Sequence, residues 1–139
     1  MANVGDTRCI LRSENGSKRL SYDDRASDEM EYDRIIKEGG VVFDGRVCGQ
    51  LMLSRAFGDW ELKCLGVSCV PHVVKHEISE NDKYIIVASD GVFDVINDSE
   101  IYNLDFSERN SKDICEIIIN KTIDKGTMDN ISCFVIKLN

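Results

Sequence analysis

The sequence predicts an α+β fold in which helices cover an antiparallel sheet. Three observations lead to this prediction. Several apolar runs of strand length are bounded by turn signals, two longer segments repeat their apolar residues at helical spacing, and no linker-like stretch divides the 139 residues. A chain of this length with 42% hydrophobic residues is in the size range of one globular domain.

The first part of the chain predicts short strands around one amphipathic helix. The expected strands span residues 2–4, 7–12, 18–21, 41–43, 46–48 and 51–54, with tight turns at Asn15-Gly16 and Asp44-Gly45. The helix is expected over residues 28–38, because Asp28 and Glu31 resemble a capping box and Gly39-Gly40 ends the apolar stripe.

The second part predicts two helices between strands. A looser stretch at 58–69 contains Trp60, and the expected strands span residues 72–78, 83–88 and 131–138. Asp98 and Ser99 are expected to cap a short helix near 99–105. A longer helix opens at Ser111 and ends before Gly126, and its wide apolar stripe predicts packing on a sheet.

Carboxylates stand where two of these buried strands end. Asp90 follows the apolar run 83–87, and Asp129 precedes the apolar run 133–136. Oxygen ligands of this kind suit Mg²⁺ and Mn²⁺, whose shells are completed by water. Asp-Gly after a strand and Asp-Asn before one are also ordinary turn residues, so spacing alone leaves both interpretations open.

Six cysteines and two histidines form neither a zinc motif nor a disulfide framework. No Cys-x-x-Cys is present, and Cys9, Cys115 and Cys133 lie in apolar segments where a free thiol packs as a small hydrophobe. Reduced, mostly buried thiols predict a cytoplasmic or nuclear location. His72 and His76 are expected on the surface of a strand.

The charge of the chain disfavours one class of partner. Asp and Glu number 25 against 17 Lys and Arg, a formal net charge of -8, and the basic residues do not cluster. Binding to a nucleic-acid backbone is therefore not expected. No apolar run reaches the roughly 18 residues that a membrane span needs, and no signal peptide is expected at the start.

Seven short segments along the chain match one protein family in that family's order. They are Ala2-Asn3-Val4-Gly5-Asp6-Thr7-Arg8, Glu31-x-x-Arg34-Ile35 with Gly39-Gly40, Val47-x-Gly49-x-Leu51, Ser54-Arg55-Ala56-Phe57-Gly58-Asp59, Pro71-x-Val73, Ala88-Ser89-Asp90-Gly91-Val92-Phe93-Asp94-Val95 and Asp129-Asn130-Ile131-Ser132. No single segment is decisive, but their number and order make the resemblance specific. The chain resembles the metal-dependent serine/threonine protein phosphatases of the protein phosphatase 2C family.

This resemblance implies a fold and a set of site residues. The implied fold is a four-layer α-β-β-α sandwich with antiparallel sheets and a binuclear metal centre at one end. Asp90 and Asp129 correspond to metal ligands, and Asp6 resembles a ligand to an additional ion. Asp94 and Asp59 are possible supporting residues; Asp94 would support bound water, and Asp59 could equally accept from turn amides.

The implied chemistry is hydrolysis of phosphoserine and phosphothreonine in protein substrates. Two or more Mn²⁺ or Mg²⁺ ions would activate a water for in-line attack, so no side chain is expected to act as nucleophile. An acidic surface is compatible with this chemistry, because bound cations can reverse the local field.

The resemblance covers the C-terminal half of a catalytic domain, so residues 1–139 are expected to be a partial domain. The family's phosphate-binding arginine, an acidic metal-contacting residue and its Asp-Gly-His-Gly-Gly motif are missing. The chain alone is expected to be inactive, and to self-associate or need a completing segment because half a domain exposes apolar sheet. The alternative is a catalytically inactive, phosphatase-like binding or regulatory module.

Overall fold

The computed structural model describes residues 1–107 and 109–138, which form two compact units. We call residues 1, 7–21 and 74–139 the sheet unit, and residues 2–6 and 22–73 the α1 unit. Residues 22–73 of the α1 unit are therefore an excursion of the chain between the second and third strands of the sheet unit, and residues 2–6 precede its first strand.

The sheet unit is built on four antiparallel strands in the order β3-β2-β7-β8. These strands are β2 (Arg8–Ser13), β3 (Gly16–Arg19), β7 (Asp82–Ala88) and β8 (Cys133–Lys137). Residues far apart in sequence pair across the sheet, since Cys9 lies opposite Val87 and Ala88 lies opposite Cys133. β7 contains a continuous apolar run, residues 84–88, which suits a strand that pairs on both sides and is at least partly covered on both faces.

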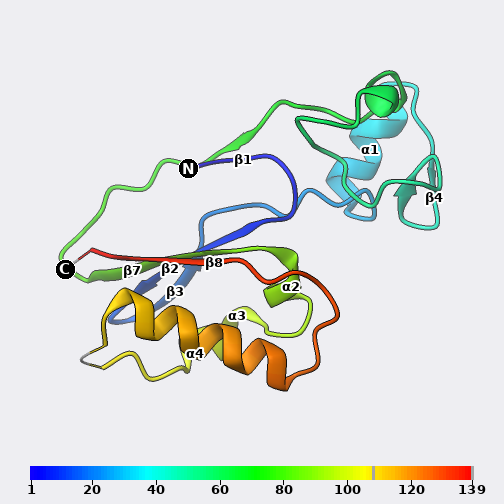
Figure 1. Cartoon of the computed structure of the whole chain (residues 1–139). Coiled ribbons are helices and arrows are strands. Elements are labelled where there is room, and N and C mark those ends of the chain that lie inside the picture. Colours follow the sequence, from blue (N-terminus) through cyan, green and yellow to red (C-terminus); the bar gives the residue numbers. More distant parts are fainter. Residues whose placement is uncertain (108, 139) are drawn as a thin grey trace. The chain divides into compact units, whose positions relative to one another are not determined.

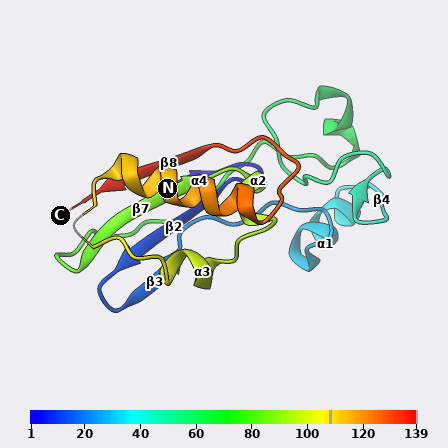
Figure 2. The same cartoon turned by 60° about the horizontal axis from the view of Figure 1, so that its bottom comes forward.

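Helices cover one face of this sheet (Figures 1 and 2). They are α2 (Asp90–Phe93), α3 (Asp98–Tyr102) and α4 (Ser111–Asp124). Ile114 and Ile118 of α4 are fully buried against Ile86 of β7, which has no exposed surface. Burial of each such side chain contributes about 1.5–3 kcal/mol. This core fixes the end of β7 and the start of β8 relative to α4.

The other face of the same sheet is only partly covered. Cys9, Leu11 and Leu20 are buried in a small apolar cluster on it. Beside them is an open cavity of about 350 Å³ with an apolar lining. Phe134 on β8 is 65% exposed. The sheet unit thus presents one packed and one largely open apolar face.

The α1 unit contains one helix and short strand pairs. Its elements are β1 (Ala2–Asn3), α1 (Glu29–Lys37), β4 (Val42–Phe43), β5 (Arg46–Val47), a 3-10 helix (Trp60–Leu65) and β6 (His72–Val73). Asp28 caps α1 by accepting from the Met30 amide, and Gly39 ends it with φ at 85°. Gly40 has no room for a side chain, because a Cβ would lie 2.1 Å from the Leu65 carbonyl oxygen.

The predicted α+β class with antiparallel sheets is confirmed, whereas several element boundaries are corrected. Residues 51–54 form only isolated bridges, and the strand expected at 72–78 ends at Val73. The looser stretch at 58–69 contains the 3-10 helix. Asn97 and Glu100 form the capping box of α3, whereas Asp98 pairs with Arg8 and Arg19 of the sheet.

Candidate functional site

Asp90 begins α2 immediately after the central strand β7. Its carboxylate accepts from the Gly91 amide at 2.9 Å, and the residue is half-buried. Asp94 ends the same short helix, donates its amide to the Asp90 carbonyl oxygen at 2.8 Å, and is exposed. Because residues four apart share one side of a helical turn, both carboxylates belong to one side of α2.

Asp129 lies in the loop between α4 and β8. Its carboxylate accepts from the Asn130 amide at 2.7 Å, and the residue is exposed. The loop continues directly into Cys133, the first residue of β8. Asp129 therefore precedes β8, and Asp90 follows the neighbouring strand β7.

The structure brings the Asp90 and Asp129 segments together at one end of the sheet. The Ser89 amide donates to the Ser132 carbonyl oxygen at 3.0 Å, which extends the β7–β8 ladder into the two loops. A Cβ on Gly91 would lie 2.2 Å from the Asn130 carbonyl oxygen and 3.5 Å from the Asp129 Cβ. Glycine at position 91 is therefore what permits this close approach.

The charges of these two aspartates are not balanced by nearby cations. Neither Asp90 nor Asp129 forms an ion pair with a basic residue in the part of the chain that the structure describes. Carboxylates gathered without a cation are suited to a hard divalent ion, which supplies the missing positive charge. The donor set therefore fits Mn²⁺ or Mg²⁺.

Asp6 and Asp59 both belong to the α1 unit. Asp6 lies 3.6 Å from the Arg25 guanidinium, an ion pair within that unit. Asp59 has left-handed backbone geometry, with φ at 55°, and precedes the 3-10 helix. Its side chain makes no capping hydrogen bond to that helix, so the structural alternative for Asp59 is not realised there. The ligand role of Asp6 stays a prediction.

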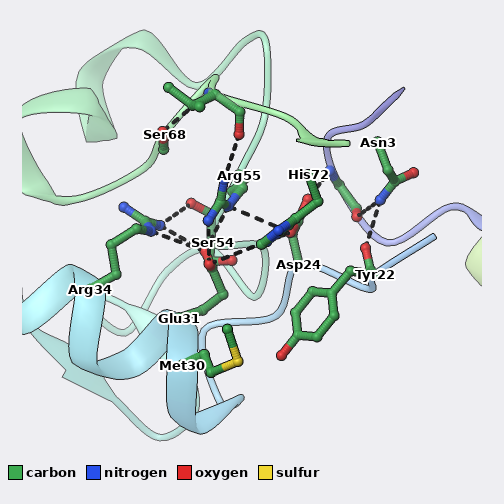
Figure 3. Close-up of polar contacts among 12 residues, drawn as sticks. Asn3, Tyr22, Asp24, Met30, Glu31, Arg34, Ser54, Arg55, Ser68 and His72 are labelled. Atoms are coloured by element: carbon green, nitrogen blue, oxygen red, sulfur yellow. Dashed lines mark hydrogen bonds and ion pairs between the residues drawn. The ribbon is translucent and has the colours of Figure 1, made fainter. Parts of the chain in front are cut away.

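The α1 unit also contains a second group of potential metal ligands. Ligand atoms of Asp24, Glu31 and His72 all lie within 4.8 Å of one another. Asp24 and Glu31 are buried, and His72 is 26% exposed at its side chain. Figure 3 shows them converging with Arg34 and Arg55. We call these five residues the charge cluster.

Two arginines already neutralise the carboxylates of the charge cluster. Arg55 donates through Nη2 to one oxygen of Glu31 at 2.6 Å and through Nε to the other at 3.0 Å. Arg34 adds a bond to Glu31 at 2.9 Å, and the Asp24 carboxylate lies 3.5 Å from Arg55 Nε. A cation placed between these acids would meet the Arg55 guanidinium. The cluster is therefore an internal ion-pair network rather than a second metal centre.

The pKa values of the two buried acids, Glu31 and Asp24, are shifted in opposite directions by this environment. Burial disfavours the charge on Glu31, but hydrogen bonds from Arg55 and Arg34 prevail and lower the pKa of Glu31 to about 2. Burial raises the pKa of Asp24, and the Gly5 amide and His72 only partly offset this effect. Glu31 is thus the strongly held anion of the charge cluster.

The charge cluster corrects two expectations from the sequence. Glu31 does not complete a capping box, because the arginines bind it instead. His72 and His76 are not simple surface residues, since each is about a quarter exposed and faces a buried carboxylate, Asp24 at 3.2 Å or Asp82 at 3.0 Å. The i, i+3 pair of Glu31 and Arg34 was the available sequence signal.

Comparisons with known proteins show that this chain is similar to members of the protein phosphatase 2C family. The family model for protein phosphatase 2C matches residues 1–131. Protein phosphatase 2C homolog 1 of Saccharomyces cerevisiae is 37% identical over 139 residues, covering 99% of this chain and 48% of the relative. The human integrin-linked kinase-associated serine/threonine phosphatase 2C is 32% identical, covering 99% of this chain and 41% of the relative.

Solved structures are similar over the same extent. A sex determining protein of C. elegans superposes with a TM-score of 0.87 at 30% identity, covering 99% of this chain and 36% of that protein. A phosphatase of Toxoplasma gondii superposes with a TM-score of 0.83 at 28% identity, covering 99% and 48%. The chain spans about half, or less, of the length of these relatives.

Proposed function

Because the chain belongs to the protein phosphatase 2C family, we propose that it supplies Asp90 and Asp129 to a metal-dependent protein phosphatase centre. The completed protein would hydrolyse phosphoserine and phosphothreonine in protein substrates. The observation that supports this proposal best is the meeting of the Asp90 and Asp129 loops at one end of the β7–β8 pair. We also propose a cytoplasmic or nuclear location, on the cysteine pattern alone.

Each carboxylate has a defined part in this proposal. Asp90 and Asp129 would hold Mn²⁺ or Mg²⁺, and Asp6 would contribute to a further ion. Asp94, one turn after Asp90 on the exposed side of α2, would orient water, and Asp59 would have a comparable supporting part. Bound divalent ions would supply an activated water and neutralise the phosphoryl oxygens. The protein residues fix positions and charge, and none is proposed as a nucleophile.

The open face of the sheet supports a proposal about partners. Phe134 and Ile136 on β8 are 65% and 41% exposed, and Ile136 lines the apolar cavity of about 350 Å³. Apolar surface of this kind favours association. We therefore propose that residues 1–139 alone self-associate or bind a completing segment, and that turnover requires the completed centre.

The test compares phosphate release from a phosphoserine peptide by three proteins in the presence of Mn²⁺. They are residues 1–139 alone, a longer chain with the preceding family segment restored, and that longer chain with Asp90→Asn or Asp129→Asn. We expect negligible release from the first, metal-dependent release from the second, and loss by orders of magnitude in the variants. Asp124→Asn is the matched control, an exposed carboxylate at the end of α4.

Two outcomes would contradict the proposal. Strong Mn²⁺-dependent release by residues 1–139 alone would show that the centre is complete without further ligands. A correctly folded longer chain without activity would favour the alternative of an inactive binding or regulatory module. Sedimentation of residues 1–139 checks self-association separately, and a stable monomer that unfolds cooperatively would contradict that part.

A further inference from the structure

Two hydroxyl groups join the loops that contain Asp90 and Asp129. The Ser89 hydroxyl donates to the Asn130 carbonyl oxygen at 3.2 Å and accepts from the Ser132 amide at 3.1 Å. These bonds add to the backbone bond between Ser89 and Ser132. Ser89 directly precedes Asp90, so the chain is fastened to the opposite loop one residue before the first carboxylate.

The second hydroxyl makes the reciprocal link. Thr127 Oγ1, two residues before Asp129, donates to the Gly91 carbonyl oxygen at 2.8 Å. Gly91 directly follows Asp90, so the chain is fastened again one residue after the first carboxylate. The Asp129 amide also points to Thr127 Oγ1, at 3.5 Å. Both carboxylates therefore lie within a closed set of side chain–backbone bonds.

We propose that Ser89 and Thr127 are positioning residues that hold the Asp90 and Asp129 carboxylates at the separation a divalent cation requires. This inference rests on the proposed function, and it adds two residues to which the metal chemistry itself assigns no role. The hydroxyls do not need to touch the cation. They act through the backbone of residues 89–91 and 129–132.

The reason for such a fastening is electrostatic. Without a cation, the two like charges repel each other and favour separation of the loops. A loop that must reorder when the ion arrives loses part of the binding free energy to that ordering. Hydroxyl bonds formed before metal arrives keep the loops together, and residues outside the first ligand sphere commonly change metal affinity by 10–100-fold.

The first measurement uses the metal-free chain, so it does not depend on activity. Amide hydrogen exchange is compared for residues 89–92 and 129–132 in wild type, Ser89→Ala, Thr127→Val and Thr127→Ser. Thr127→Val keeps the shape of the side chain and removes the donor. We expect about tenfold faster exchange in Thr127→Val and in Ser89→Ala, where the Ser132 amide loses its acceptor, and near wild-type rates in Thr127→Ser.

The second measurement is a Mn²⁺ titration followed by the amide signals of Asp90 and Asp129. It gives the Mn²⁺ concentration at which paramagnetic broadening has halved the height of these signals, and it detects weak binding as well. We expect this concentration to rise about tenfold in Thr127→Val and to return toward wild type in Thr127→Ser. Thr122→Val is the matched control, because Thr122 Oγ1 donates to the Ile118 carbonyl oxygen at 2.7 Å inside α4 and is buried. It removes an equivalent bond outside the two loops.

The outcomes separate this inference from the proposed function. Unchanged loop exchange in both Ser89→Ala and Thr127→Val would overturn the inference, as would equal changes in Mn²⁺ concentration for Thr127→Val and Thr122→Val. A wild-type chain whose Asp90 and Asp129 signals are insensitive to Mn²⁺ would instead contradict the proposed metal role. Faster exchange with weaker Mn²⁺ binding only in the loop variants would support the inference.

Discussion

Two regions of this molecule gather carboxylates, and they differ in what balances the charge. In the charge cluster of the α1 unit, Asp24 and Glu31 are buried and meet the guanidinium groups of Arg34 and Arg55. At the end of the sheet unit, Asp90 and Asp129 have no such partner among the described residues. Acidic composition alone would rank both as metal sites. Among the described residues, the negative charge of Asp90 and Asp129 is not neutralised by a basic side chain, so this region can bind a cation from solution.

The largest expected effect comes from removing the internal cation of the charge cluster. Arg55→Met should lower the free energy of unfolding of the α1 unit by about 3–5 kcal/mol, because it leaves buried carboxylates uncompensated. Urea unfolding followed by the amide signals of α1 measures this loss. Arg46→Met is the control, since among the described residues the Arg46 side chain donates only to the Gln50 carbonyl oxygen, at an exposed position. Equal midpoints for the two variants would refute an essential role for Arg55.

Acid should weaken the charge cluster within a defined window. The folded-state pKa of Glu31 is about 2, below its ordinary 4.5, so its stabilisation is present above about pH 4.5 and is lost as the pH falls toward 2. We expect a loss on the order of 2 kcal/mol from this group. Glu31→Gln should flatten the profile, which urea midpoints between pH 5 and 2 will show.

Asp24 provides a second test, because its pKa is shifted in the opposite direction to that of Glu31. Its pKa is raised by burial, so the folded state holds that proton more readily, and stability from this group grows as the pH falls. Asp24→Asn should therefore steepen the loss seen on acidification. A profile unaffected by either substitution would mean that the cluster does not control acid stability.

Metal should discriminate between the two regions. Added Mn²⁺ is expected to broaden amide signals near Asp90 and Asp129 and to leave those near Asp24, Glu31 and His72 unchanged. Asp90→Asn should raise the required Mn²⁺ concentration about tenfold or more, whereas Asp24→Asn should not change it. Broadening centred on His72 would reverse the assignment of the two regions.

The smallest expected effect concerns His72. Its Nε2 atom faces the Asp24 carboxylate at 3.2 Å. His72→Leu removes this electrostatic contact, which does not have hydrogen-bond geometry, and should cost about 1 kcal/mol of stability or less, whereas His72→Gln keeps a polar N–H group and should cost less. Urea midpoints for the pair measure the difference. A larger loss in His72→Gln than in His72→Leu would contradict an attractive contact between His72 and Asp24.

Local pattern predicted much of the sheet unit and little of the charge cluster. The apolar run of β7 and the helical spacing of α4 are local signals, and both elements were expected close to their actual positions. The strand expected at 51–54 fails because Leu51 and Leu53 make only single bridges, to Val47 and Arg25. The structure of residues 51–54 was therefore determined by the lack of a pairing strand among the described residues and not by the β-propensity of the residues.

The two carboxylate regions differ in predictability for the same reason. The sequence placed Asp90 and Asp129 at strand ends, and the resemblance to the family assigned both to a metal centre; the structure adds that the two strands are neighbours. Glu31 and Arg55 are 24 residues apart, in a helix and in an irregular segment, so no periodicity links them. Their contact follows from tertiary packing, as does the approach of Thr127 to Gly91.

The placement of the α1 unit within the chain has a consequence for the order of folding. β2 must pair with β7, whose paired residues follow 69 to 80 positions later (Ser13 with Asp82, Arg8 with Ala88), and such distant pairing is slow because loop closure costs entropy. Within the α1 unit, Ala2 pairs with Val73, so its formation brings together the chain just before β2 and just before β7. The excursion thus shortens the effective loop, and early assembly around Arg55 would speed later formation of the sheet.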